Sequence, residues 1–555
     1  MTTQVKPRPA AQVMRLDRLG SSHQHRLSFM RVLLRRIKSE AWTFTRTAFK
    51  INDNGVGHAV YTVNTGSRDY SLVAFAHDLP AHMRSDRVIA TAWDATFTLF
   101  DGIPTDADIE RLGANIPLQE AGRVSDKELS VSRANRSVRL WQHVVDRLAS
   151  GLQPDPDLVF QVGYLMRTTA VYGSGKLGAA DREWTENRAE FVAPFQIEML
   201  SVWLTRAFVM DLVEHMARAK GGDKAIVLDP AMRRRFGIGN STGLGMAPYL
   251  INHPLLLNNW IAAREEAIAR VRNVEHATDG EIETFKEMLR RAGLSVAEWH
   301  SEHPIQVEKL ASLRADVAEM TSHLASADLK APRPWDALWR WAERALSLEG
   351  QELLTSLMME PYGHLVDGLS DCMCANEAIG TRIDGAMKIG ELRLLVEKNY
   401  GWALATDWTE PASQARCWYT SEEKLEPRLG ERFEEPIAEF EQPLCPGRDI
   451  SRAYLDTVEL PDEMSVADFV LQFPQHRHAV RRAQIVARFP YAEIYDNTIS
   501  DKVMAIDLLR AKLAFFGALH FDPRSDRWVR INMYRGAPFP HELATMDPDN
   551  WGYPQ

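Results

Sequence analysis

Two clusters of glycine and small polar residues interrupt a long helical pattern, and they constrain the fold more than any other feature of the chain. The first runs over 172–178 and the second over 237–246. Glycine within a helix costs about 1 kcal/mol per residue relative to alanine, so helices should stop at both clusters. Glycine also lets the backbone turn sharply or approach another group closely. We therefore predict two glycine-rich loops inside a mainly helical region.

Length and composition narrow the class of protein. At 555 residues the chain is too long for one compact core, and several domain-sized units are expected. The net charge of −10 argues against a nucleic-acid partner. Four cysteines without a C-x-x-C pair argue against a structural zinc site. We find no secretory signal or membrane-spanning run, so we expect a cytoplasmic location and no membrane partner. A homo-oligomer is expected only because such assemblies are common.

Periodicity predicts the main helices. Apolar residues recur at helical spacing over 27–41 and 138–148, and the run 191–216 is apolar nearly all round, as in a buried helix. Basic residues share the opposite face of the first of these helices, and we expect that face to be solvated: Arg31, Arg35 and Lys38. The more charged stretch 273–324 is expected to form a peripheral helical hairpin.

The β signal is concentrated near the N-terminus. Two runs, 57–63 and 70–75, flank a glycine-containing turn and predict a hairpin. The run 88–100 predicts a third strand, which gives a small antiparallel sheet that must pack on helices. Near the C-terminus, 501–516 predicts a helix and 528–534 a strand.

These patterns predict a predominantly α fold with α+β parts: a central helical bundle, a small N-terminal antiparallel sheet and a mixed C-terminal unit. The proline- and glutamate-rich stretch is expected to be a surface connection or a lid. The predicted organisation is a flexible N-terminal arm at 1–26, a helix plus sheet unit at 27–131, a helical core at 132–405, the connection or lid at 406–463 and an α+β unit at 464–555.

The composition of the first glycine cluster predicts a binding site for an anionic ligand. Its Gly-Ser-Gly-Lys run is not a Walker motif, because Ala170 and Leu177 stand where that motif needs a glycine and a hydroxyl. Free backbone N–H groups at a helix start, together with an ammonium group, would still hold a carboxylate or phosphate. The candidate residues are Arg167, Tyr172, Ser174 and Lys176. The alternative is a plain turn between helices with a surface lysine.

The second glycine cluster is not a dinucleotide-binding fingerprint. Its glycine spacing is one residue too long, and the pattern before it, over 229–235, is helical, whereas a Rossmann site needs a strand there. Three small donors lie between its glycines: Asn240, Ser241 and Thr242. We expect this loop to order over a ligand, while capping and core hydrogen bonding remain the alternative.

Two further groups are weaker candidates. At helical spacing, His364, Asp367 and Asp371 share one face, which would suit a divalent metal or a solvated surface. Arg382 lies between two glycines, Gly380 and Gly385, and its planar guanidinium could bind a carboxylate through two hydrogen bonds. Asn376 is assigned to the same binding group.

The sequence therefore favours a non-redox enzyme of lyase or hydrolase type that acts on a small anionic molecule held between the glycine-rich loops. Lys176 and Ser241 are the predicted catalytic residues, and the remaining candidates bind the substrate. No cofactor is predicted, and a divalent metal stays open. The alternatives are a helical interaction or scaffold protein without catalysis, or a metal-dependent enzyme centred on His364.

Overall fold

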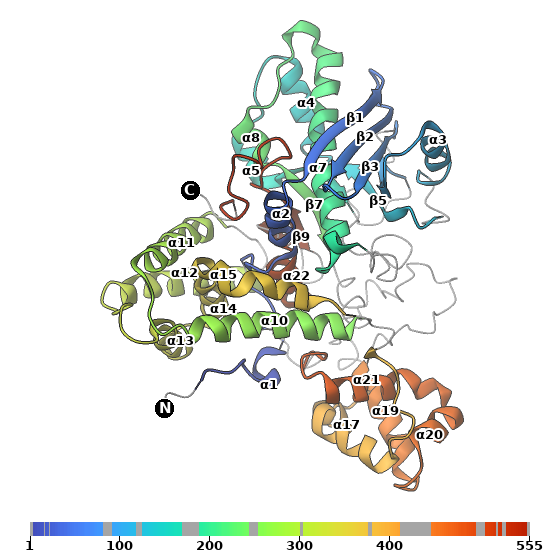
Figure 1. Cartoon of the computed structure of the whole chain (residues 1–555), viewed down its shortest axis with the longest axis vertical. Helices are drawn as coiled ribbons and strands as arrows, with labels where there is room; N and C mark the ends of the chain where they lie inside the picture. Colours follow the sequence, from blue (N-terminus) through green and yellow to red (C-terminus); the bar gives the residue numbers. More distant parts are fainter. Residues whose placement is uncertain are drawn as a thin grey trace.

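A mixed sheet organises the chain, and among the described residues it has nine strands in the order β1-β2-β3-β4-β5-β6-β7-β9-β8 (Figure 1). The computed structural model describes residues 4–15, 17–21, 23–80, 92–117, 125–168, 188–242, 253–299, 304–375, 380–410, 446–495, 505–517, 520–523 and 529–551. The strands are β1 (Thr43–Ile51), β2 (Gly57–Asn64), β3 (Asp69–Ala76), β4 (Ala95–Asp101), β5 (Glu128–Arg136), β6 (Tyr164–Thr168), β7 (Gly237–Thr242), β8 (His520–Pro523) and β9 (Val529–Met533).

The predicted hairpin is present as β2 and β3, but the sheet extends well beyond 56–101. Strands β5 to β9 continue it, so the sheet draws on three of the predicted segments. The part of the second glycine cluster over 237–242 is a strand rather than a loop, because β7 pairs with β6 on one side and β9 on the other. Strands β6 and β7 are parallel, and every other neighbouring pair is antiparallel. The mainly α fold with α+β parts is confirmed at this coarser level.

Helix α7 (Gln196–Gly221) covers one face of the sheet and connects the two parallel strands (Figure 1). Paired residues of neighbouring strands project to the same face, and those facing α7 are mostly apolar, such as Tyr61, Phe97 and Ala134. The predicted apolar helix over 191–216 is thus confirmed as a buried one. Other elements of the sheet layer are α2 (Phe29–Ser39), α3 (Asp106–Asn115), α4 (Trp141–Ala149), α5 (Pro156–Val162), α8 (Pro230–Arg234), η2 (Ala189–Phe191) and η3 (Gly222–Lys224).

A second layer of helices packs below the sheet layer (Figure 1) and shares its apolar core through Trp260, Trp335 and Trp339. The predicted helical hairpin over 273–324 is present as α11 and α12. This layer comprises α10 (Pro254–Arg272), α11 (Asp279–Glu298), α12 (Pro304–Leu324), α13 (Pro334–Ala345), α14 (Leu348–Met358), η4 (Glu360–Tyr362), α15 (Gly363–Val366) and η5 (Asp367–Met373). Helix α22 (Ala505–Phe516) lies in the same region, and a short α1 (Ala10–Val13) precedes α2.

Residues between 380 and 489 form a separate helical unit with its own apolar core, at the bottom of Figure 1. Most of the predicted connection or lid, 411–445, lies outside the described residues. The following part, which belongs to the same predicted segment, is helical in α19. The unit comprises α17 (Ile389–Leu404), α19 (Pro446–Val458), α20 (Val466–Gln472), η6 (Pro474–His476) and α21 (Arg477–Arg488).

The basic face of α2 is only partly solvated, whereas the sequence predicted a solvated face: Lys38 is exposed, Arg35 is half-buried and Arg31 is buried. Arg31 is fully buried and forms a bidentate pair with Glu360, at 2.6 and 2.7 Å. Arg35 donates to Asp549 at 2.7 Å. Burial alone would raise the pKa of Asp549, but the arginines around it hold that pKa well below its usual range. The charges are compensated by acidic residues more than 300 positions away, which helical periodicity cannot reveal.

The segment predicted as a flexible arm packs into the core. Arg8 is 4% exposed and pairs with Glu265 in a bidentate contact at 2.7 and 2.8 Å, and with Glu352 at 3.0 Å. Val5 pairs through its backbone with the Asn273 side-chain amide. The sequence predicted a flexible arm here, but a basic residue of this segment, Arg8, forms a buried ion pair.

Close packing explains the glycine at position 239. A Cβ atom there would lie 2.6 Å from the Tyr164 ring on β6, nearer than atoms can approach without a shift. We therefore expect Gly239→Ala to lower the free energy of unfolding by about 1–3 kcal/mol, as other overpacking substitutions do. Urea titration followed by tryptophan fluorescence measures this. The matched control is Gly280→Ala, since a Cβ atom at Gly280 would meet nothing within 4 Å. Equal midpoints for the two variants would contradict the steric explanation.

Candidate functional site

Polar side chains cross one face of the sheet at the level where β6 and β7 end. In register, Thr96 on β4 pairs with Arg133 on β5, Asn135 on β5 pairs with Arg167 on β6, and Gly239 on β7 pairs with Asn532 on β9. Arg167 also pairs with Gly239, so these residues share one face. We call Thr96, Arg133, Asn135, Arg167 and Asn532 the polar row. It lies on the face opposite α7.

Burial sets the polar row apart from an ordinary solvated sheet face. Asn135 and Arg167 are 7% and 8% exposed, and Asn532 is 2% exposed. Farther along the same face the side chains are apolar, as at Val73 and Val131, and pack around α3. Burying polar groups costs free energy unless they form hydrogen bonds. A row of buried polar side chains within a sheet face therefore indicates a hydrogen-bonding site rather than a part of the apolar core.

Within the row, Asn135 is fixed by the backbone before β4. Asn135 accepts a hydrogen bond from the Asp94 backbone N–H at 2.9 Å and donates to Ala92 O at 3.2 Å. The Asp94 carboxylate in turn accepts from the Arg136 backbone N–H at 3.0 Å and lies 3.6 Å from its guanidinium. These contacts hold the ends of β4 and β5 in fixed positions beside the row.

Aromatic stacking orients the arginines at this edge. The guanidinium of Arg133 lies 4.0 Å from the centre of the Trp93 ring, and that of Arg136 lies 4.6 Å from the Trp141 ring. A stacked guanidinium is held in one plane, which favours two-point binding of a carboxylate or phosphate. The edge of the sheet thus presents oriented cationic groups.

A histidine stands beside the row. His77 follows β3, and its Nε2 lies 3.0 Å from Thr96 Oγ1. Burial lowers the pKa of His77, and the nearby Asp94 carboxylate opposes that shift. A half-buried imidazole with a pKa below its usual value is mostly neutral at pH 7, so it can accept a proton.

The parallel strands β6 and β7 end at one edge of the sheet. The chain leaves β6 after Thr168 just before the first cluster, and β7 ends within the second. The Asn240 side chain donates to Thr168 O at 2.7 Å and joins the two strand ends. Ligands of α/β sheets commonly bind beyond the carboxyl ends of parallel strands. The geometry therefore marks this edge as the candidate site.

The structure brings together two of the predicted site residues, Arg167 and Asn240, on neighbouring strands. Their side chains lie on opposite faces, since Asn240 pairs with the core residue Ile531 under α7 and Arg167 belongs to the polar row. Ser241 and Thr242 form the end of β7, and their side chains are outside the described part. Four further predicted residues lie outside the described residues: Tyr172, Ser174, Lys176 and Asn376.

The remaining candidates lie elsewhere. Arg382 is exposed in the lower helical unit, where its backbone carbonyl accepts a hydrogen bond from Arg488 at 3.2 Å. Asp367 is held by Arg26 through two hydrogen bonds of 2.7 and 2.8 Å, while His364 and Asp371 are exposed. In the part that the structure describes, no three His, Cys, Asp or Glu side chains are placed to hold a metal. The structure thus does not assemble the His364 group as a metal centre.

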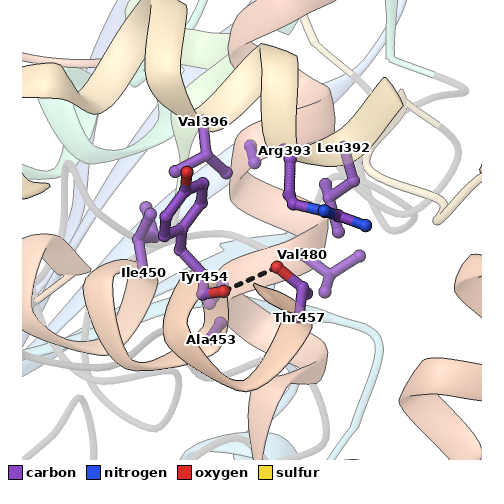
Figure 2. A pocket seen from close by; sticks show the side chains of 10 residues that line it. Leu392, Arg393, Val396, Ile450, Ala453, Tyr454, Thr457 and Val480 are labelled. Carbon is purple, nitrogen blue, oxygen red and sulfur yellow. Dashed lines mark hydrogen bonds between the residues drawn. The ribbon is translucent and has the colours of Figure 1, made fainter. Parts of the chain in front are cut away.

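A mainly apolar pocket lies within the lower helical unit. Figure 2 shows it between α17, α19 and α21, lined by side chains such as Leu392, Val396, Ile450 and Val480. Tyr454 and Thr457 contribute one internal hydrogen bond of 2.6 Å, from Thr457 Oγ1 to Tyr454 O. It is a gap in a helical core, and the charged side chain that lines it, Arg393, donates to Asp462 at 2.6 Å.

Sequence reasoning missed most of the polar row. Arg133 and Asn135 flank the core residue Ala134 at a spacing of two, which is the alternation of a half-buried strand, and that signal was present in the sequence. The contributions of His77, Asp94 and Asn532 depend on strand order, which a single sequence does not give.

Comparison with known proteins gives no further assignment: no protein-family model matches the chain, and no curated protein or solved structure matches it significantly. Among the helices that the structure describes, none is both long and apolar enough to cross a membrane.

Proposed function

We propose that the chain is a non-redox enzyme of lyase or hydrolase type that acts on a small anionic substrate at the polar row. The observation that supports this is the buried, oriented cationic edge where β6 and β7 end. Arg167 is the central binding group, and Arg133 extends the cationic surface on the next strand.

The proposed roles follow the chemistry of the residues. A guanidinium donates two parallel hydrogen bonds to a carboxylate or phosphate, so Arg167 and Arg133 bind the substrate's charge. His77 is the described group best suited to accept a proton, and general acid–base catalysis of this kind contributes about 10²- to 10⁴-fold. Lys176 and Ser241 remain the proposed catalytic residues from the two glycine clusters, and a divalent metal remains open.

Substrate binding is tested first with Arg167→Ala. A panel of organic anions, including succinate, citrate and sugar phosphates, is screened by thermal shift, where a hundredfold excess over Kd adds about 2.7 kcal/mol of stability. For the anion that binds the wild type, we expect Arg167→Ala to weaken affinity by about 30-fold or more, because truncating a buried charged partner costs about 2–5 kcal/mol. Isothermal titration calorimetry measures the change.

The control is Arg46→Ala. Arg46 is an exposed arginine on β1, the strand at the far edge of the sheet, and it forms an ion pair with Asp211. Equal affinity in the wild type and Arg167→Ala would argue against the polar row as the binding site. Turnover of the identified anion by both Lys176→Ala and Ser241→Ala at the wild-type rate would remove the catalytic assignment while leaving binding intact.

An interaction or scaffold role is the second candidate, and exposed leucines favour it. Leu471 on α20 is 81% exposed, Leu394 on α17 is 66% exposed and Leu455 on α19 is 63% exposed. Large exposed apolar side chains on one unit are a common feature of protein-binding surfaces. Under this proposal, no organic anion stabilises the protein, and Leu394→Asp together with Leu471→Asp abolishes a stable complex isolated by size-exclusion chromatography.

A further inference from the structure

A second group of polar side chains lies in the interior, at the junction of α10 and α22. The ring of Phe515 on α22 is bordered by the ring of Trp260 at 3.9 Å, the ring of His25 at 5.7 Å and the guanidinium of Arg264 at 5.6 Å. Ser28 lies against the end of α22, because a Cβ atom on Gly517 would be 2.7 Å from Ser28 Oγ. We call His25, Ser28, Trp260, Arg264 and Phe515 the Phe515 cluster.

The elements that carry the cluster are firmly connected. Trp260 and Arg264 are one turn apart on α10, so both face α22. The His25 backbone N–H donates to Ala514 O at 3.1 Å, which holds the segment before α2 against the same helix. All members are at most 2% exposed. The cluster is therefore part of the interior and separate from the polar row, which lies on the sheet.

The hydrogen bonding of His25 defines its tautomer. Its Nδ1 accepts from the Leu27 backbone N–H at 3.1 Å, so in the neutral ring the proton is on Nε2, which is then a donor. Burial, and after it the charges of Arg264, Arg31 and Arg35, lower the pKa of His25 well below its usual value. The ring is therefore neutral, and Nε2 cannot bind a metal while it holds this proton. Its partner must be an acceptor.

Four polar atoms of the cluster have no hydrogen-bond partner within the described ranges: His25 Nε2, Ser28 Oγ, Trp260 Nε1 and Arg264 Nη2. Of these, Arg264 Nη2 has an ion-pair contact of 2.9 Å with Glu265 Oε1. Leaving a buried donor unsatisfied costs about 1–3 kcal/mol, and native proteins leave few such groups. The two ring N–H groups can only donate, so whatever satisfies them supplies oxygen or another acceptor.

The charge around the cluster favours an anion. Arg264 belongs to a buried ionic group in which Arg8, Arg18 and Arg264 face the carboxylates of Glu265 and Glu352, with contacts of 2.7–3.8 Å. Three guanidinium groups thus face two carboxylates. We propose that the Phe515 cluster is an interior binding site for a small oxyanion, a carboxylate or a phosphate, held by the N–H groups of His25 and Trp260 beside Arg264.

The test uses Trp260→Phe, which keeps the ring and removes the N–H donor. It is made on the Arg167→Ala background, so that binding at the polar row does not contribute. Acetate and inorganic phosphate are titrated separately in a thermal-shift assay to distinguish the two classes of oxyanion. We expect one of them to stabilise Arg167→Ala, and we expect the added Trp260→Phe change to weaken its apparent affinity about tenfold. Ser28→Ala is the second, milder variant and should weaken it as well.

The matched control is Trp339→Phe, because Trp339 Nε1 is also buried without a partner among the described residues but lies on α13 beside Arg8. It should bind the anion as the Arg167→Ala protein does. Stabilisation by neither acetate nor phosphate would overturn the proposal, and so would equal weakening by Trp339→Phe and Trp260→Phe. Because the background lacks Arg167, these outcomes are independent of the polar row and of the proposed function.

Discussion

Replacing Glu360 with glutamine should lower the free energy of unfolding by about 3 kcal/mol, the lower end of the range for breaking a buried ion pair. Glu360 accepts two hydrogen bonds from the fully buried Arg31, and Arg26 lies 3.5 Å from the same carboxylate. The substitution keeps the size of the side chain and removes its charge. Arg31 then stays buried with Asp549 as its remaining carboxylate, at 3.2 Å.

The effect is measured by urea titration followed by tryptophan fluorescence, with Glu287→Gln as the matched control. Glu287 forms a bidentate pair with Arg290 at 2.6 and 2.7 Å, but both residues are about half exposed. Exposed pairs contribute little, so the control should keep the wild-type midpoint. A wild-type midpoint for Glu360→Gln would show that the cluster around Arg31 does not stabilise the fold.

The same cluster shows how far the sequence predicts the fold. The helix over 27–41 follows from apolar spacing, and the structure has it as α2. The position of its basic face does not follow, since Arg31 and Arg35 pair with carboxylates at positions 360 and 549. Local periodicity predicts elements because their backbone bonding is local. It cannot predict ion pairs between residues hundreds of positions apart.

The candidate site shows a similar division. The glycines at 237 and 239 predicted that another group approaches the backbone closely. The structure shows such an approach, and the groups that approach belong to neighbouring strands. Asn240 was predicted as a ligand donor in a loop and instead joins the ends of β6 and β7. Arg167 was identified from its nearness to the first glycine cluster, whereas the rest of the polar row required the strand order. The residue types thus predict which groups can bind a ligand, whereas the pairing of the strands decides which of these groups lie on the same face of the sheet.

The second large effect on stability is expected for substitution of Glu265, which accepts hydrogen bonds from Arg8 in the N-terminal segment. Glu265 is fully buried and binds Arg8 through two hydrogen bonds and Arg264 through contacts of 2.9 and 3.0 Å. Burial alone would raise the pKa of Glu265, but Arg8 and Arg264 lower it overall, so the group is ionised at pH 7. Glu265→Gln should therefore destabilise the protein by about 3–5 kcal/mol.

A double-mutant cycle with Arg8→Met separates the uncompensated charge from lost packing. If Glu265→Gln is costly because Arg8 is left buried with Glu352 as its remaining carboxylate, removing both charges should cost less than the sum of the single substitutions. Urea midpoints give the coupling, and limited proteolysis before residue 26 reports release of the segment. Additive effects would mean that the two side chains stabilise the fold independently. Strong coupling, with cleavage in each single variant, would mean that a segment with the composition of a flexible arm is held in place by one buried carboxylate.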